Sequence, residues 1–172
     1  RLLQHVHFPV RLQALLSGSQ LPPSQFELEI TESAMMLDPK RALQIIGRLG
    51  ELGVLISIDD YGTGYSTLAY LRRLPLDELK IDKSFTMGMM LDAGDSLIVR
   101  STIELAHKLG LTVVAGGVED ESTLKELRSL GCDAVQGFLV SRPLAAEDVP
   151  SWVRESPWTR RARDTTSLRR VR

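Results

Sequence analysis

Short apolar runs alternate with amphipathic segments along most of the chain. Val54, Ile56 and Ile58 recur at every second position before a pair of aspartates, which predicts a short buried strand. Residues 26–31 alternate apolar and polar side chains and predict a second strand. Three further strands are predicted at 79–82, 111–115 and 133–138.

Helical spacing of apolar residues is found between these predicted strands. The sequence Asp38-Pro39 is a favourable helix start, and Gly53 is a favourable end. Other helices are predicted at 8–16, 95–109, 122–130 and 144–153. For the segment 95–109 we expect an inward face made of Ile98, Thr102, Leu105, Ala106 and Leu109.

The order of these segments predicts an α/β fold with a parallel sheet covered by helices. Candidate polar residues fall near the ends of successive strands: Glu29, Asp59, Lys80 and Gln136. This arrangement is typical of a (β/α) barrel, whose active site lies at the carboxyl ends of its strands. A doubly wound open sheet is the alternative.

Composition narrows the class of protein. A chain of 172 residues with 43% apolar and 25% charged residues suits one globular domain. A net charge of −1 gives no overall field for a nucleic-acid polymer or an anionic membrane. A single cysteine, Cys132, suits a reducing compartment, so we expect a cytoplasmic protein, alone or as part of a longer membrane or sensor protein. The sequence contains no apolar run long enough to span a membrane and no signal-peptide pattern, and its start without Met suggests a fragment.

Arginine dominates the chain from about residue 154. A segment with so few apolar residues is expected to be a disordered, solvated tail at 154–172, and contact with nucleic acid or acidic lipid is the alternative. The domain itself is expected to cover residues 1–153.

Asp59 and Asp60 follow a buried strand directly and precede Gly62-Thr63-Gly64. Adjacent carboxylates raise each other's pKa unless a cation or a donor offsets the repulsion. The pair alone is therefore compatible with a divalent-metal site or with an Asx turn of solvated aspartates.

Five short motifs occur in a specific order. They are Glu29-Ile30-Thr31-Glu32-Ser33, Asp59-Asp60-Tyr61-Gly62-Thr63-Gly64, Leu79-Lys80-Ile81-Asp82, Gly117-Val118-Glu119 and Gln136-Gly137-Phe138-Leu139-Val140-Ser141-Arg142-Pro143. In this order they resemble the EAL domain, the bacterial cyclic di-GMP phosphodiesterase family, over about residues 9–153. The resemblance implies a modified (β/α)₈ barrel, here about its last five strand–helix units, that hydrolyses cyclic di-GMP to linear pGpG with two Mg²⁺ or Mn²⁺ ions.

The resemblance also implies roles for single residues. Glu29, Asp59 and Asp60 match metal ligands, with Asp59 bridging two ions, and such ions prefer hard oxygen ligands. Lys80 matches a catalytic lysine that contacts the nucleophilic water or the phosphate, and Gln136 matches a substrate-binding glutamine at the mouth of the site.

Other matched positions surround this centre. Glu32 corresponds to a glutamate that steadies the loop Gly62-Thr63-Gly64, which couples dimerisation to metal geometry in the family. Glu119 corresponds to a glutamate that is either structural or catalytic.

Two departures from the family pattern stand out. The Glu-Ala-Leu motif and the asparagine of the third strand belong before Arg1. The chain is therefore expected to be a fragment with a missing N-terminal segment, a degenerate gene product, or a piece completed by a partner, for example in a homodimer. Gly116 occupies the position of a catalytic carboxylate. We therefore expect an impaired or inactive phosphodiesterase, with a non-catalytic module that binds cyclic di-GMP or a protein as the alternative.

Several remaining residues have plainer interpretations. His5 and His7 are expected to be exposed rather than a metal pair, and His107 is expected to be structural. Met87, Met89 and Met90 suit packing or a dimer surface.

Overall fold

The computed structural model describes residues 2–64 and 71–159. Within them, five parallel strands form one sheet in the order of the sequence. The strands are β1 (Glu27–Thr31), β2 (Leu55–Tyr61), β3 (Glu78–Ile81), β4 (Thr112–Ala115) and β5 (Ala134–Val135). A sheet that adds each new strand beside the previous one confirms the barrel-type prediction, because a doubly wound sheet reverses its strand order.

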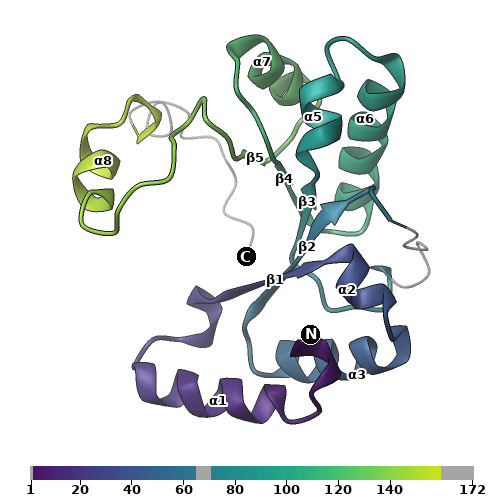
Figure 1. The fold of residues 1–172 in the computed structure, drawn as a ribbon, viewed down its shortest axis with the longest axis vertical. Coiled ribbons are helices and arrows are strands. Elements are labelled where there is room, and N and C mark those ends of the chain that lie inside the picture. Colours follow the sequence, from purple (N-terminus) through teal and green to yellow (C-terminus); the bar gives the residue numbers. More distant parts are fainter. Residues whose placement is uncertain (1, 65–70, 160–172) are drawn as a thin grey trace.

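Helices connect the strands: α1 to α3 lie beside β1 and β2, and α5 to α7 lie beside β3 and β4 (Figure 1). They are α1 (Phe8–Ser19), α2 (Glu32–Met36), α3 (Pro39–Glu51), α5 (Lys83–Gly88), α6 (Ala93–Lys108), α7 (Glu121–Ser129) and α8 (Val149–Glu155), with short 3₁₀ turns at Leu2–Gln4 and Pro23–Gln25. Figure 1 shows α8 apart from the other helices.

Local sequence fixes the limits of the three long connecting helices. An aspartate side chain accepts a backbone hydrogen bond at the start of each: Asp38 for α3, Asp92 for α6 and Asp120 for α7. A glycine with φ near +80° follows each helix, at positions 53, 110 and 131. The predicted helix end at Gly53 is therefore confirmed, and Gly110 and Gly131 end their helices in the same way.

The core consists of two apolar clusters. The first joins α3, β1 and β2, and the second joins β3, β4, α6 and α7. Three partly buried residues pack against both clusters: Tyr61, Leu76 and Leu109. These residues connect the two halves of the sheet.

The predicted inward face of α6 was partly wrong. Thr102 and Ala106 are buried as expected, but Val99 and Ile103 complete the buried stripe, and Ile98 is 37% exposed. Both stripes are apolar at helical spacing, so the periodicity alone did not decide which one faces the sheet.

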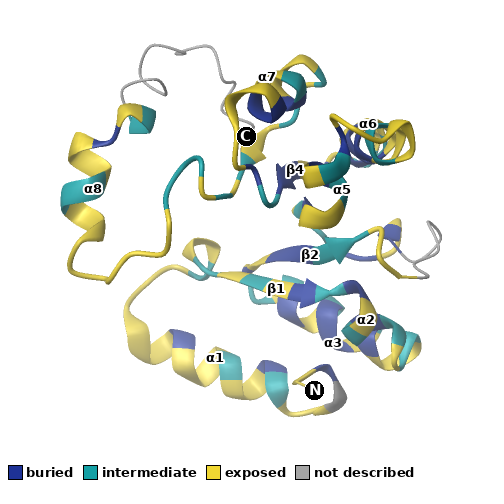
Figure 2. Ribbon diagram, turned by 45° about the horizontal axis from the view of Figure 1, so that its top comes forward, coloured by how far each residue is buried: buried dark blue, intermediate teal, exposed yellow. Residues whose placement is uncertain are grey.

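The described structure continues past residue 153, where the domain was expected to end. α8 ends at Glu155 without a buried residue (Figure 2), and Trp158 packs against the second cluster. The expected tail from residue 160 onward lies outside the described residues, and the domain boundary stays a prediction. Among the described helices, none has the length and apolar character needed to cross a membrane.

Candidate metal and phosphodiester site

A cleft of about 550 Å³ lies at the carboxyl ends of the strands. Its lining includes most of the residues selected from the sequence: Glu29, Asp59, Asp60, Lys80, Gly116, Glu119 and Gln136. Parallel strands place their carboxyl ends at the same edge of a sheet, which explains why residues so distant in sequence share one cleft.

Lys80 is the cation at the centre of this cleft. Its side chain is only 11% exposed, and its Nζ lies 2.6 Å from Glu29 Oε1 and 3.7 Å from Asp59 Oδ1. Burial lowers the pKa of Lys80, but the hydrogen bond to Glu29 and the charge of Asp59 outweigh it and raise the pKa. The lysine is therefore a protonated group held between two carboxylates.

Asp60 has an unusual backbone. The strand runs through the aspartate pair to Tyr61, with a register shift between Ile58 and Tyr61. Asp60 adopts φ +56°, a left-handed conformation that is uncommon outside glycine. With this backbone conformation the Asp60 side chain reaches Asp82, with which it forms a hydrogen bond.

The Asp60 carboxyl group has a raised pKa. Burial is the largest cause, followed by the charges of Asp59 and Asp82 and a hydrogen bond to Asp82. The pKa of Asp82 is lowered: burial opposes the shift, but hydrogen bonds from the Ser84 hydroxyl and backbone outweigh it. Asp82 lines the same cleft and was given no role from sequence, although its place two residues after Lys80 was a usable signal.

Glu32 holds the loop that follows the aspartate pair. Its side chain is 1% exposed, and its Oε2 accepts hydrogen bonds from Gly62 N at 3.1 Å and Gly64 N at 3.2 Å. Thr63 Oγ1 donates to the Asp60 carbonyl oxygen at 2.9 Å. Glu32 thus holds the two glycines of the loop, and Thr63 ties the loop to Asp60.

Gly116 leaves part of the cleft wall without a side chain. A Cβ atom there would lie 3.2 Å from the Ile81 carbonyl oxygen and 3.8 Å from Lys83 N, and the backbone needs no positive φ. The site therefore has room for a side chain after a small adjustment, unlike Gly117, where a Cβ would collide with Lys83.

A second pair of carboxyl groups was not anticipated. Glu27 is exposed, and its side chain forms a hydrogen bond with Glu78. Burial, then the charge of Glu27 and that hydrogen bond, raise the pKa of Glu78 to about 7. Glu27 lies two residues before Glu29, and Glu78 lies two residues before Lys80. Side chains two positions apart in a strand point to the same side of the sheet, so this spacing in the sequence indicates that the four side chains share one side.

Ser57 lies in the same region. Its buried Oγ has no hydrogen-bond partner, and its register partners on the neighbouring strands are Glu29 and Glu78. The inward side of the sheet is therefore polar and rich in negative charge beneath the cleft.

The donor set fits divalent cations of the hard type. Glu29, Asp59 and Asp60 supply carboxylate oxygens at one edge. Two lysines, Lys80 and Lys83, line the same cleft and do not balance the charge of its five carboxylates, which include Asp82 and Glu119. Magnesium and manganese prefer such oxygens, and magnesium keeps several waters and takes only one or two carboxylates. Within residues 2–64 and 71–159, no three His, Cys, Asp or Glu side chains are placed so that they could together hold a metal ion.

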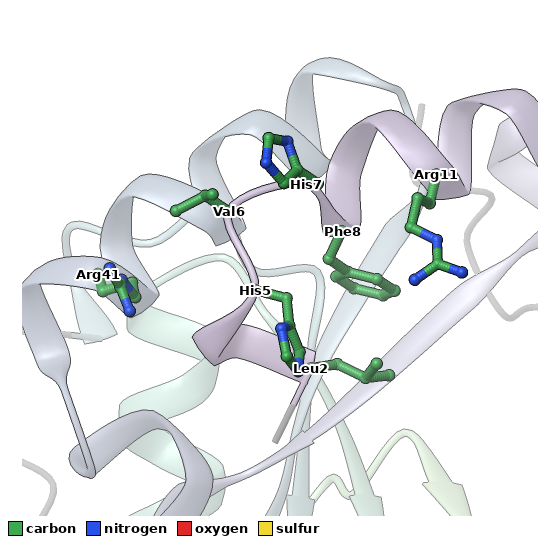
Figure 3. A pocket seen from close by; sticks show the side chains of 7 residues that line it. All are labelled: Leu2, His5, Val6, His7, Phe8, Arg11 and Arg41. Carbon is green, nitrogen blue, oxygen red and sulfur yellow. The ribbon is translucent and has the colours of Figure 1, made fainter.

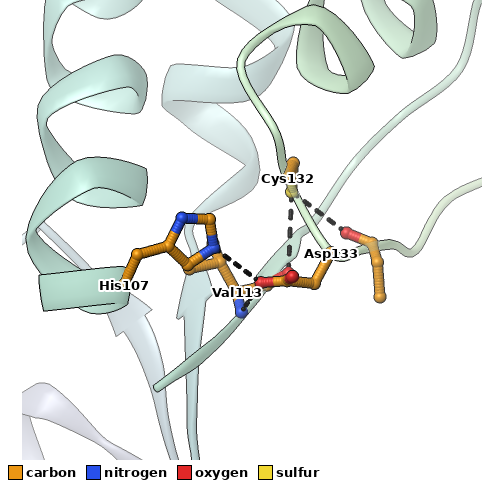
Figure 4. A network of polar contacts seen from close by, with 5 residues as sticks. His107, Val113, Cys132 and Asp133 are labelled. Carbon is orange, nitrogen blue, oxygen red and sulfur yellow. Dashed lines mark hydrogen bonds and ion pairs between the residues drawn. The ribbon is translucent and has the colours of Figure 1, made fainter. Parts of the chain in front are cut away.

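The histidines lie outside this cleft. His5 and His7 are both exposed, and Figure 3 shows their rings pointing to different sides of a cavity of about 370 Å³ near the N-terminus. His107 Nε2 lies 2.9 Å from Asp133 Oδ2, which also accepts a hydrogen bond from Val113 N (Figure 4). The His107 contact joins the end of α6 to the segment before β5, a structural arrangement.

Cys132 lies next to this network. Burial raises the pKa of its thiol to about 11, so the thiol stays protonated near neutral pH.

The fold and the cleft together define a (β/α)-barrel protein with a carboxylate and lysine centre. The family model of the EAL domain matches residues 1–143, so the chain belongs to the EAL domain family. It is 48% identical over 136 residues to the bifunctional diguanylate cyclase/cyclic di-GMP phosphodiesterase MucR of Pseudomonas aeruginosa, covering 79% of this chain and 20% of MucR. The chain spans about a fifth of the length of the curated relatives that it matches first.

Solved structures agree with this assignment. A structure described as the PaMucR phosphodiesterase in complex with c-di-GMP superposes with a TM-score of 0.83 at 43% identity, covering 86% of this chain and 60% of that one. A manganese and c-di-GMP complex of Klebsiella pneumoniae BlrP1 gives a TM-score of 0.76 at 33% identity, covering 83% and 36%. The expected family and barrel-type fold are thus confirmed.

Proposed function

We propose that this chain carries a divalent-metal-dependent cyclic di-GMP phosphodiesterase site of the EAL type, with an impaired hydrolytic step. The observation that carries the proposal is the shared position of Glu29, Asp59 and Lys80 at the carboxyl edge of the sheet. The c-di-GMP complexes of MucR and BlrP1, and the manganese in the latter, support the same ligand and metal class.

Each residue has a chemical task in this proposal. Mg²⁺ or Mn²⁺, held by Glu29, Asp59 and Asp60, would supply an activated water and charge stabilisation for an in-line displacement. The protonated Lys80 attracts the phosphate and orients the water, since its ammonium group already lies within reach of both carboxylates. Gln136, at the mouth of the cleft, donates or accepts hydrogen bonds with the substrate.

Impairment is proposed from Gly116. A cleft that lacks a carboxylate at this position has lost one candidate for the general base. Removing a positioned base typically costs about 10²–10⁴ in rate. The second candidate function, a non-catalytic module that binds cyclic di-GMP, follows from the same observation, because Lys80 and Gln136 still line the cleft.

Titration calorimetry with Mn²⁺ and cyclic di-GMP, combined with chromatography of the products, tests the proposal. We expect measurable binding, slow formation of pGpG, and loss of Mn²⁺ binding in Asp59→Asn. Asp148→Asn, at an exposed helix end without a side-chain cap, is the matched control. Unchanged Mn²⁺ affinity in Asp59→Asn would refute the metal site, and turnover at ordinary enzyme rates would refute the impairment.

A homodimer through α6 is part of the same proposal. Leu97 and Ile98 are exposed beside a cavity of about 490 Å³ that also includes Gly62 and Gly64. An apolar surface next to the metal-site loop suits contact with a second copy. Sedimentation velocity should show a concentration-dependent dimer that Leu97→Glu abolishes; a monomer at all concentrations would refute it.

The expected cytoplasmic location is likewise proposed. The single cysteine, with its protonated and partly buried thiol, suits a reducing compartment.

A further inference from the structure

The cavity of about 370 Å³ near the N-terminus, which we call the N-terminal cavity, has apolar walls (Figure 3). Leu2, Val6 and Phe8 line it. Leu2 is 60% exposed and Val6 is 47% exposed, so hydrophobic surface lies open to water here. Covering such surface with an apolar ligand is favourable.

The remaining residues of the lining are basic. Arg11 on α1 and Arg41 on α3 contribute guanidinium groups, and Figure 3 shows them on either side of the apolar group, with His5 and His7 between them. Among the described residues, no carboxylate lines this cavity, whereas Glu32 lines the cavity beside α6 and five carboxylates line the catalytic cleft. The net charge of the chain is −1, so this local positive charge is not a general property of its surface. The rim of the N-terminal cavity therefore favours an anionic group.

A second cavity of about 220 Å³, which we call the inner cavity, shares Leu2 and Phe8 with the N-terminal cavity. Its other apolar lining residues are buried or half-buried: Leu3, Leu28, Ile30, Ala34 and Leu49. Leu2 belongs to a 3₁₀ turn of three residues and is largely exposed, so its side chain can move aside without loss of core packing. The two cavities thus lead from a basic rim to an apolar interior.

Charge also fixes the direction in which an amphipathic anion would bind. Glu29 is the charged residue that lines the inner cavity, and its carboxylate would repel a second one. The rim with Arg11 and Arg41 would attract it. A hydrocarbon chain therefore points inward and its anionic group points to the rim. Cavities of a few hundred Å³ suit one small molecule.

We propose that the two cavities form a binding site for a medium-chain acyl carboxylate. The carboxylate lies at the rim, near Arg11 and Arg41, and the chain passes between Leu2 and Phe8 into the inner cavity. Apart from Glu29, the lining of this site shares no residue with the catalytic cleft. The inference therefore does not depend on the proposed function.

Calorimetric titration of the full chain with octanoate, octanol, hexanoate and acetate tests the ligand class. We expect octanoate to bind and octanol, which has the same chain length without the charge, to bind more weakly. Hexanoate lacks two methylene groups and should bind about tenfold more weakly than octanoate, and acetate should not bind measurably. Added salt should weaken octanoate and leave octanol unchanged.

Substitutions test where each end of the ligand lies. The double variant Arg11→Gln/Arg41→Gln should weaken octanoate by about 2- to 30-fold and leave octanol within twofold. Lys125→Gln/Arg128→Gln removes two exposed charges of α7 and is the matched control, with no change expected. Ala34→Leu fills part of the inner cavity and should weaken octanoate more than hexanoate.

Several outcomes would overturn the inference. A wild-type chain that does not bind octanoate, or that binds octanol equally well, excludes a site for an acyl anion. Equal effects of the arginine variant and its control would exclude the rim, and unchanged octanoate affinity in Ala34→Leu would exclude the inner cavity. Octanoate affinity that falls as the protein concentration rises would show that a second copy covers the cavities instead. Thermal melting of each variant separates lost binding from unfolding.

Discussion

Gly116 is the residue at which this chain differs most in chemistry from the site that surrounds it. Carboxylates and a lysine line the rest of the cleft, and the wall at Gly116 has no side chain. The backbone there is accessible to any residue, and the nearest atom to an added Cβ is a carbonyl oxygen at 3.2 Å. A side chain at this position would therefore change the chemistry of the cleft with little change in the fold.

We predict that Gly116→Glu raises the rate of cyclic di-GMP hydrolysis by about 10²–10⁴, because a positioned base is restored. The measurement is pGpG formation with Mn²⁺ under single-turnover conditions. Gly116→Gln has nearly the same shape without the charge and should not gain activity. Equal rates in both variants would show that a carboxylate at this position does not act as the base.

Glu78 carries a second prediction at the scale of a residue. Its pKa is raised from 4.5 to about 7, so between these values the folded chain holds a proton that the unfolded chain releases. Glu78 therefore lowers the stability of the fold progressively as the pH rises from 4.5 to 7. Above pH 7 this loss is complete.

We predict that Glu78→Gln raises the melting temperature more at pH 8 than at pH 5. Each 1 kcal/mol by which the substitution increases the free energy of unfolding should raise the melting temperature of a domain of this size by about 2–4 °C. Differential scanning calorimetry at both pH values checks the difference, with Glu104→Gln, an exposed residue of α6, as the control. The same gain at both pH values would contradict a shifted pKa at Glu78.

At the scale of elements, helix ends and strand order follow from local sequence. Capping aspartates fix the starts of α3, α6 and α7, and the glycines at positions 53, 110 and 131 fix their ends. The alternation of strands and helices predicts the parallel sheet. The short helices α2 and α5 were not predicted, because segments of five or six residues carry too little periodicity.

Some features of the site depend on contacts between strands and could not be predicted from the sequence. The left-handed backbone of Asp60 and the shift of register before Tyr61 depend on pairing between β2 and β3. The contact between Glu27 and Glu78 joins two strands that are not neighbours in the sheet. Patterns within one segment contain no information on either feature.

The loop after β2 depends on a residue of α2. Glu32 Oε2 accepts both the Gly62 and Gly64 hydrogen bonds from a buried position. We predict that Glu32→Gln destabilises the fold by about 1–3 kcal/mol, because charge-assisted bonds to buried donors are lost. Urea unfolding measures the loss, and amide exchange should quicken at Gly62 and Gly64.

Glu51→Gln, at the exposed end of α3, is the matched control for that variant. Protected amides at Gly62 and Gly64 in Glu32→Gln would show that the loop is held by other contacts.

At the scale of the whole molecule, the two apolar clusters are joined by few residues. Figure 1 shows the N-terminal half, with α1 to α3, and the half with α5 to α7 meeting along the strands. The residues that pack against both clusters are Tyr61, Leu76 and Leu109, and all three are only partly buried. Cooperative unfolding of the halves should therefore depend on this narrow junction.

We predict that Leu76→Ala destabilises the chain by about 2 kcal/mol, near the lower limit for such truncations because Leu76 is not fully buried. The same change should separate the unfolding of the two halves. Trp158 packs against the second cluster and Trp152, the other tryptophan, lies on α8, so tryptophan fluorescence does not report on the first cluster, whereas far-UV circular dichroism reports on both halves. In urea the two signals should coincide for the wild type and diverge for Leu76→Ala. Leu91→Ala, at a residue 93% exposed, should change neither signal. Coincident transitions in Leu76→Ala would show that the halves stay coupled without Leu76, through Tyr61, Leu109 and the pairing of β2 with β3.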